Sequence, residues 1–208
     1  MVSLSRLAVL CVAVLFTCGL SFAQDAPAPT QPPEKNVEKA RNPVVVIETS
    51  LGAIKAELWP DKAPVTVANF LAYTNEKFYD GLIFHRVIDG FMIQGGGFNA
   101  KMEQKNTTHD PIKNEATADK KNLRGTLAMA RTAVVDSATS QFFINLADNA
   151  FLDHKDNTPA GFGYCAFGKV IEGLDIVDKI GKAQTVNRAG YQDVPAQTIE
   201  IKSVRVAE

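Results

Sequence analysis

The stretch "FHRVIDGFMIQGGGF", residues 84–98, places an arginine, a Phe-Met-Ile-Gln run and three successive glycines close together. The bulky apolar side chains can form the wall of a pocket, while the guanidinium is a permanent hydrogen-bond donor. The three glycines indicate a backbone that turns tightly and that another group approaches closely. This mixture predicts a site that binds an apolar group and performs a polar task on it.

Strand patterns lie on both sides of this stretch. The segment "PVVVIETSLGAIKAELW", residues 43–59, predicts two strands around a turn at residues 50–52, because apolar and polar side chains alternate in its second half. Further strands are predicted at residues 83–87, 91–94, 125–130, 141–146, 164–170 and 197–206. In the last of these the parity of the apolar residues changes after Ile201, which predicts a bulge near Lys202 or Ser203.

Two helices are predicted among these strands. The segment "PVTVANFLAYTNEKF" begins with a proline, and its residues Val67, Phe70 and Leu71 recur at helical spacing. A second helix is predicted over residues 171–180, with Gly181 ending it. Mostly consecutive strands with two isolated helices predict a mostly β domain, in which an antiparallel sheet closes into a barrel and the helices cover its openings.

Length and composition indicate a single globular domain. A chain of 208 residues, 46% hydrophobic and 22% charged, is long enough for one well-filled domain and short for two. It has 22 basic and 23 acidic residues and a formal net charge of −1. This near balance gives no general attraction to nucleic acid or acidic membranes, and no run of like charge indicates a local one. Nucleic acid is therefore not an expected partner.

Residues 1–23 have the pattern of a secretory signal peptide. One positive charge at Arg6 precedes an apolar core, and the small residues leading up to Ala23 predict cleavage after that position. The core, residues 7–16, is shorter than the ~20 residues that span a bilayer, so we expect no membrane insertion of the mature chain. A lipoprotein modified on Cys18 and a single-pass anchor are the alternatives.

The mature chain divides into a spacer and a domain. Residues 24–41 are rich in proline and predict a flexible segment, which leaves residues 42–208 as the folded domain. Removal of the signal peptide leaves Cys165 as the only cysteine, so we expect no internal disulfide. Between tyrosine and apolar neighbours, Cys165 is expected to be a small core residue and not a nucleophile.

The motifs do not support hydrolytic, metal or phosphate chemistry. Serine, histidine and aspartate are present, but there is no G-x-S-x-G elbow or related motif. The three histidines, His85, His109 and His154, show no short ligand pairing, so no metal site is expected. The glycine run lacks the Gly-Lys-Ser/Thr ending of a phosphate-binding loop. We therefore expect no cofactor.

Four motifs, "FHRVIDGFMIQGGGF", "RGTLAMAR", "SATSQFFINLADNAFLD" and "FGYCAFGKVIEGLDIVDKI", follow one another in the order and at about the spacing seen in the cyclophilins. From about Pro43 to Val206 the chain resembles the periplasmic cyclophilin type of Gram-negative bacteria. The resemblance implies an eight-stranded antiparallel barrel with two capping helices and peptidyl-prolyl cis-trans isomerase activity (EC 5.2.1.8). It also implies a periplasmic monomer whose partners are unfolded or proline-containing polypeptides and which assists the folding of exported proteins.

The resemblance assigns roles to twelve residues. Arg86 donates a hydrogen bond toward the prolyl nitrogen in the twisted transition state, and Gln94 binds the substrate backbone beside it. The proline pocket is implied to consist of the walls Phe91, Met92, Phe143 and Leu152 and the rim residues Phe151 and Tyr164. The main chain around Ala130, Arg131 and Thr132 is implied to clamp the residue before proline, with Gln141 orienting the set. His85 is expected to be structural, and Phe142 is expected in the barrel core.

Three positions depart from the common eukaryotic pattern. Arg131 stands where asparagine is usual, Phe151 where tryptophan is usual and Tyr164 where histidine is usual. We therefore expect weak cyclosporin binding with catalysis intact. The long polar segment, residues 99–122, is expected to be a surface excursion over the barrel.

Two other classes of function compete with the enzyme. In one, a proline-reading binding module or holdase chaperone captures unfolded chains and its turnover is incidental. In the other, a structural envelope protein is tethered by the proline-rich N-terminal segment. Arg86 and Gln94 favour the enzyme, because a protein that only binds proline has no evident use for a guanidinium directed at the imide.

Overall fold

The predicted hairpin begins the domain. In the computed structural model, which describes residues 42–207, it consists of β1 (Val44–Thr49) and β2 (Gly52–Leu58). The turn is closed by Thr49, whose hydroxyl donates to the Gly52 carbonyl at 2.6 Å and accepts from the backbone N–H of Leu51 at 3.0 Å. The predicted signal peptide, its lipoprotein and anchor alternatives, and the proline-rich segment of residues 24–41 all lie outside the described residues.

Eight strands close into one antiparallel barrel, in the order β1-β10-β3-β4-β6-β5-β7-β2. The remaining six are β3 (Leu82–Ile88), β4 (Met92–Asn99), β5 (Thr126–Met129), β6 (Phe142–Asn145), β7 (Ala166–Glu172) and β10 (Glu200–Val206). In β10 the pairing skips Lys202, since Glu48 pairs with Ser203 and Thr49 with Ile201. The predicted mostly β, closed eight-stranded barrel with two helices is confirmed, and so is the bulge.

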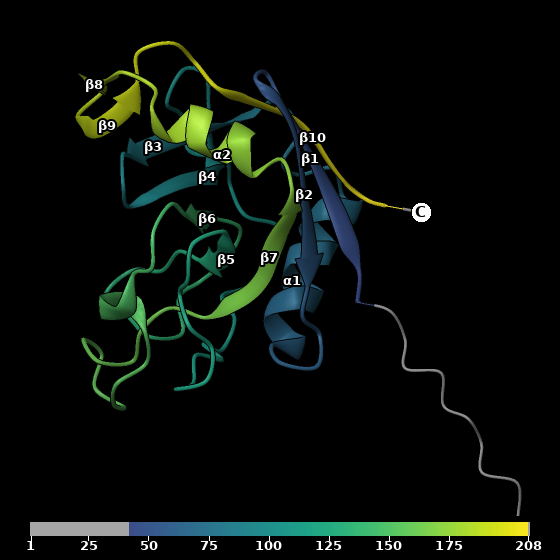
Figure 1. Ribbon diagram of the computed structural model, residues 1–208, viewed down its shortest axis with the longest axis vertical. Helices are drawn as coiled ribbons and strands as arrows, with labels where there is room; N and C mark the ends of the chain where they lie inside the picture. The colour runs from purple at the N-terminus through teal and green to yellow at the C-terminus, as the bar shows by residue number, and fades with distance from the viewer. Residues whose placement is uncertain (1–41, 208) are drawn as a thin grey trace, which may run out of the picture. The chain divides into compact units, whose positions relative to one another are not determined.

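The helices α1 (Pro64–Asn75) and α2 (Leu174–Gly181) lie at opposite ends of the barrel (Figure 1). Val67 and Phe70 of α1 and Val177 and Ile180 of α2 are buried in the same core cluster as the inward-facing strand residues. Because they close both ends, the interior is a packed hydrophobic core.

The second helix starts later than predicted. Residues 171 and 172 belong to β7, and the chain changes direction at Gly173, whose φ of +82° only glycine adopts readily. A Cβ at Gly173 would lie 2.3 Å from the carbonyl oxygen of Ala53, which adds a steric reason for glycine. Gly181 is the last helical residue, and the helix cap is Lys182.

The three glycines do not form a turn, contrary to the prediction; they stay within β4. Gly96 has a φ of +83°, which bends the strand where its pairing with β3 is irregular. A methyl group at Gly97 would lie 2.6 Å from Cδ of Gln141, so the glycine allows the Gln141 side chain to lie against the strand. The predicted close approach is present, and the group that approaches belongs to the protein itself.

The segment of residues 99–122 does more than cover the barrel. Its Glu115 accepts hydrogen bonds from the backbone N–H groups of Val65 (3.1 Å) and Thr66 (2.8 Å) in the first turn of α1. The N-cap residue, Ala63, has no side chain that could do this. A carboxylate at this position also complements the positive end of the helix dipole, so the segment stabilises the start of α1.

The prediction missed a small hairpin, β8 (Thr185–Arg188) with β9 (Tyr191–Pro195), which forms its own two-stranded sheet. Its turn contains Ala189 and Gly190, both with positive φ. The hairpin packs on β3 and β4 through Val194, which is buried with Ile83, Phe98 and Met102. A short, mostly polar strand pair gives a weak alternation signal, and its stability comes from this packing.

Candidate active site

An apolar pocket of about 120 Å³ opens beside strands β3, β4 and β6. It is lined by nine of the twelve predicted site residues: Arg86, Phe91, Met92, Gln94, Ala130, Arg131, Phe143, Leu152 and Tyr164. Four of the side chains that form or support its wall, Met92, Ala128, Phe143 and Leu152, make a cluster separate from the barrel core. The structure thus brings together residues from five separate parts of the chain.

Phe142 and Phe143 show how strand geometry builds this pocket. Neighbouring residues in a strand point to opposite faces of the sheet. Phe142 is fully buried in the barrel core, where its ring meets Phe70 edge-on at 5.4 Å. Phe143 points the other way, into the pocket wall, with its ring 5.7 Å from that of Tyr164. Both placements agree with the prediction.

The polar edge of the pocket combines Arg86 with Gln94. The two residues pair across β3 and β4, so their side chains emerge side by side. Nε2 of Gln94 donates to Oε1 of Gln141 at 2.9 Å, which orients the Gln94 amide. The Arg86 side chain is 43% exposed, and its Nε lies 3.7 Å from Oδ2 of Asp193. Asp193 belongs to the hairpin that sequence reasoning missed.

A second, polar hollow of about 390 Å³ adjoins the apolar pocket, with which it shares Gln94, Ala130 and Arg131. Its other lining residues are Gln104, Thr107, Thr132, Ser137, Thr139 and Gln141. The predicted Thr132 and Gln141 therefore line this hollow and not the apolar pocket. Gln104 and Thr107 were not predicted, and the polarity of their segment was the only signal for them.

The rim carries the residues that depart from the eukaryotic pattern. Phe151 lines neither hollow; it is 61% exposed, and its ring lies 5.4 Å from that of Phe91. The guanidinium of Arg131 lies 4.8 Å from the ring centre of Tyr164. It also donates to the Gly163 carbonyl from Nε and to the Pro159 carbonyl from Nη2, each at 3.0 Å. Arg131 thus holds the loop that contains Pro159 and Gly163 against the rim of the pocket.

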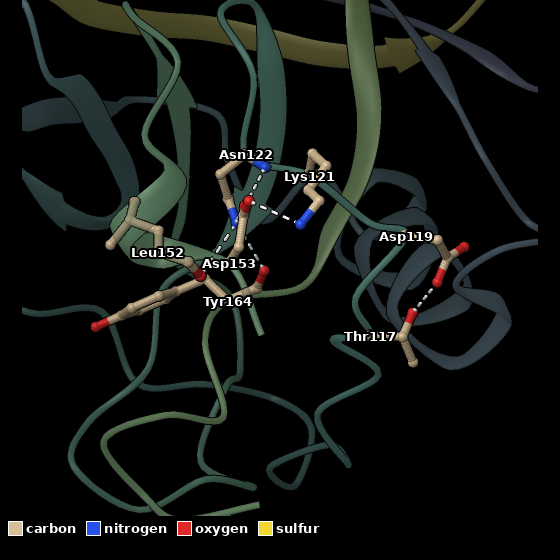
Figure 2. Close-up of polar contacts among 7 residues, drawn as sticks. All are labelled: Thr117, Asp119, Lys121, Asn122, Leu152, Asp153 and Tyr164. Carbon is tan, nitrogen blue, oxygen red and sulfur yellow. Dashed lines mark hydrogen bonds and ion pairs between the residues drawn. The ribbon is translucent and has the colours of Figure 1, made fainter. Parts of the chain in front are cut away.

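The opposite wall is held by a buried amide. Asn122 donates from Nδ2 to the backbone carbonyls of Leu152 at 3.2 Å and Tyr164 at 3.1 Å, as Figure 2 shows. Its own backbone N–H donates to Asp153 at 2.8 Å, and Lys121 lies 3.3 Å from the other carboxylate oxygen. A buried polar group without a hydrogen-bond partner costs free energy of folding. The Asn122 side chain therefore fixes the backbone of Leu152 and Tyr164, two pocket residues that come from different segments.

Neither His85 nor Cys165 offers acid–base or nucleophilic chemistry at neutral pH. Burial lowers the pKa of His85 to about 4, and the positive charge of Arg86 adds to this effect. The imidazole packs against Phe98 with ring centres 4.5 Å apart, in agreement with a structural role. Burial raises the pKa of the Cys165 thiol to about 11. Within residues 42–207, no group of three or more potential metal ligands is found.

No helix among the described residues is long and apolar enough to cross a membrane.

The fold and the site together have the features of a cyclophilin: a closed eight-stranded barrel, two helices, and an apolar pocket with an arginine at its edge. The chain belongs to this family, because the model for cyclophilin type peptidyl-prolyl cis-trans isomerases matches residues 44–206.

Curated relatives and a solved structure agree with this assignment. The chain is 55% identical over 162 residues to peptidyl-prolyl cis-trans isomerase A of Dickeya dadantii (strain 3937), a match that covers 78% of this chain and 83% of that protein. It is 53% identical over 165 residues to isomerase B of Escherichia coli (strain K12), covering 79% and 100%. A Cryptosporidium parvum cyclophilin, crystallised in the presence of the dipeptide Ala-Pro, superposes with a TM-score of 0.68 at 28% identity, covering 79% and 99%. The protein is a peptidyl-prolyl cis-trans isomerase, EC 5.2.1.8.

Proposed function

We propose that Arg86 is the catalytic residue of this isomerase. The peptide C–N bond resists rotation by ~18–20 kcal/mol, because the nitrogen lone pair is delocalised into the carbonyl. In the twisted state the lone pair is localised on the prolyl nitrogen and can accept a hydrogen bond. A guanidinium donor at the edge of an apolar pocket stabilises that state more than either planar one. This position of Arg86 beside the pocket is the observation that carries the proposal.

The other site residues hold the substrate around the rotating bond. The proline ring enters the pocket between Met92, Phe143 and Leu152, and Gln94 contacts the substrate backbone near Arg86. The residue before proline lies along Ala130, Arg131 and Thr132, toward the polar hollow. Ala130 already donates its N–H to Gln141, and Thr132 donates its own to Ser137, so these two amides are not free for the substrate. The Ala130 carbonyl is the group we assign to that contact.

A single charged donor can supply much of the acceleration. Uncatalysed prolyl isomerisation runs at roughly 0.01–0.1 per second, and typical enzymes turn over at about 1–1000 per second. The difference corresponds to about 1.4–7 kcal/mol, since each 1.36 kcal/mol is a factor of ten. Neither a nucleophile nor a proton transfer is required, because the reaction is a rotation about the C–N bond and breaks no covalent bond. Variants of Arg86 in a protease-coupled proline-peptide assay test this proposal.

The proposed substrates are proline-containing segments of exported proteins during folding in the periplasm. The signal-like pattern of residues 1–23 supports this location, and the solved relative crystallised in the presence of Ala-Pro supports the substrate class. The site suits segments of unfolded chains, because the apolar pocket continues into the adjoining polar hollow of about 390 Å³.

Export predicts a defined mature N-terminus. We expect protein from an envelope fraction to begin at Gln24, since the apolar core of residues 7–16 is followed by a small-residue cleavage site ending at Ala23. Intact-mass spectrometry measures this directly. A lipid adduct on Cys18 would identify a lipoprotein instead, and a retained Met1 would identify an uncleaved anchor; either result contradicts the proposal.

Cyclosporin inhibition is expected to be weak and to depend on position 151. The resemblance to the cyclophilins implies that an indole at this position donates a hydrogen bond to the inhibitor, whereas the phenyl ring of Phe151 has no donor. Phe151→Trp should therefore tighten inhibition several-fold, corresponding to about 0.5–1.5 kcal/mol for one hydrogen bond. Peptide turnover should hardly change, because Phe151 is 61% exposed and lines neither hollow. Equal inhibition constants for the two proteins would show that another residue limits cyclosporin binding.

A further inference from the structure

Asp193 forms an ion pair with the proposed catalytic residue. Its Oδ2 lies 3.7 Å from Nε of Arg86, and the two side chains are 38% and 43% exposed. Among residues 42–207, no other carboxylate forms an ion pair with Arg86. Asp193 is not part of the barrel; it comes from β9, far along the chain from β3. The small hairpin thus supplies a charged group to the edge of the pocket.

The β8–β9 hairpin packs against β3 and β4, the two strands that carry Arg86 and Gln94. Next to Asp193, Val194 is completely buried against Ile83 of β3 and Phe98 of β4. On the other side, the ring of Tyr191 meets that of Phe98 edge-on at 5.1 Å. These contacts fix the backbone around Asp193 relative to β3 and β4, so the carboxylate has a defined position beside the guanidinium.

The backbone at Asp193 adopts an unusual conformation. Its φ is +61°, in the left-handed region that most residues with a side chain avoid and that aspartate and asparagine tolerate best. Such conformations persist only where the surrounding structure imposes them, and they are enriched at functional sites. Ala189 and Gly190 at the tip of the hairpin also have positive φ, as its turn requires, whereas Asp193 lies outside that turn and its side chain forms the ion pair with the guanidinium.

Contact at Nε has a specific chemical consequence for Arg86. The guanidinium has five N–H donors in a planar fork, of which Nε carries one and the two terminal nitrogens carry four. The Asp193 carboxylate, 3.7 Å from Nε, attracts this side of the guanidinium without a hydrogen bond, so it restrains the rotation of the side chain and leaves the N–H donors for the substrate. Orientation matters here, because small displacements of a catalytic donor reduce transition-state stabilisation.

We propose that Asp193 is a positioning residue, which orients the Arg86 guanidinium toward the pocket and makes the β8–β9 hairpin part of the active site. The proposal rests on the catalytic role proposed for Arg86. Asp193 itself does not touch the substrate; it acts only through the arginine.

The first test replaces the charge without changing the shape. Asp193→Asn is isosteric and tolerates a positive φ, so the fold and melting temperature should be preserved. We expect kcat/KM to fall about two- to fivefold, the upper range for a partly exposed ion pair, with the loss in kcat. The difference from wild type should shrink as salt approaches 1 M, where the screening length is ~3 Å. Unchanged kcat/KM at low salt would overturn the proposal.

Two matched variants separate the carboxylate from the backbone and from net charge. Asp193→Gly favours the left-handed φ and should be at least as stable as wild type, yet it should lose the same activity as Asp193→Asn. Glu172→Gln removes one negative charge from the Lys55–Glu172 pair (2.8 Å), which lies on β2 and β7 and lines neither hollow. It should retain wild-type activity. An active Asp193→Gly, or an equal loss in Glu172→Gln, would contradict a positioning role.

A double-mutant cycle distinguishes failure of this proposal from failure of the proposed function. In an Arg86→Ala background, Asp193→Asn should have no further effect, because its target is gone. The same fold loss in both backgrounds would show that Asp193 acts on something else, and the positioning role would be wrong. An Arg86→Ala protein with wild-type activity would instead overturn the catalytic role of Arg86 itself.

Discussion

Arg86→Ala should lower kcat/KM for a proline peptide by roughly ten- to thousandfold, about 1.4–4 kcal/mol, the range for removing one transition-state donor. The fold should be preserved, since the Arg86 side chain is partly exposed and contributes nothing to the barrel core. Peptide binding should weaken much less, because the walls formed by Met92, Phe143 and Leu152 remain. A protease-coupled assay measures turnover, and calorimetry with a non-cleavable proline peptide measures binding.

Two further measurements make this prediction specific to a guanidinium. Arg86→Lys keeps the charge but loses the planar fork, so it should still lose most activity. For wild type, kcat/KM should be nearly flat from about pH 6 to 9, because arginine stays protonated and the pKa of His85, lowered to about 4, lies below this range. A bell-shaped profile, or an Arg86→Ala enzyme as fast as wild type, would contradict the mechanism.

The second large effect concerns acid stability. Burial lowers the pKa of His85 from an ordinary 6.5 to about 4 in the folded protein. Below pH 6.5 the unfolded chain therefore binds a proton that the folded protein does not, and the folded state loses stability as pH falls toward 4. The full shift corresponds to about 3 kcal/mol of unfolding free energy. Urea denaturation at a series of pH values from 7.5 to 4 measures it.

A variant without a titrating group isolates this contribution from that of the carboxylates. His85→Phe retains an aromatic ring against Phe98, where the imidazole now lies at 4.5 Å between ring centres. It also removes the buried Nδ1, which has no hydrogen-bond partner among the described residues. The difference in stability between the two proteins should change by about 3 kcal/mol between pH 6.5 and 4. Parallel pH curves for wild type and His85→Phe would show that His85 is not the origin of acid sensitivity.

Local patterns were enough to predict the closed barrel, whereas the pocket residues were predicted from the resemblance to the cyclophilins. Alternation in β1 and β2 and the opposite faces of Phe142 and Phe143 follow from the two-residue period of a strand. The change of apolar parity after Ile201 likewise revealed the bulge at Lys202, because one extra residue reverses which side chains face the core. The roles of Arg86 and Gln94 came from motif resemblance, since periodicity carries no information about chemistry.

The conformation at Gly96 could not be predicted from the local sequence. A glycine with positive φ suits both a turn and an irregular strand, and the pairing of β4 with β3 and β6 selected the strand. The start of α2 was predicted wrongly for a related reason. Ile171 and Glu172 fit a helix or a strand, and the pairing of Glu172 with Lys55 of β2 keeps both residues in β7.

By itself the sequence determined the closed β-barrel, its two helices and the identity of the pocket walls, because these depend on periodicity and on motifs within single segments. Only the tertiary structure placed Asp193 beside Arg86, Asn122 behind the pocket wall and Glu115 at the start of α1. Each of these contacts joins segments that are distant in the chain. The strength of each contact depends on burial and geometry where the two segments meet, and neither can be predicted from a local pattern of residues.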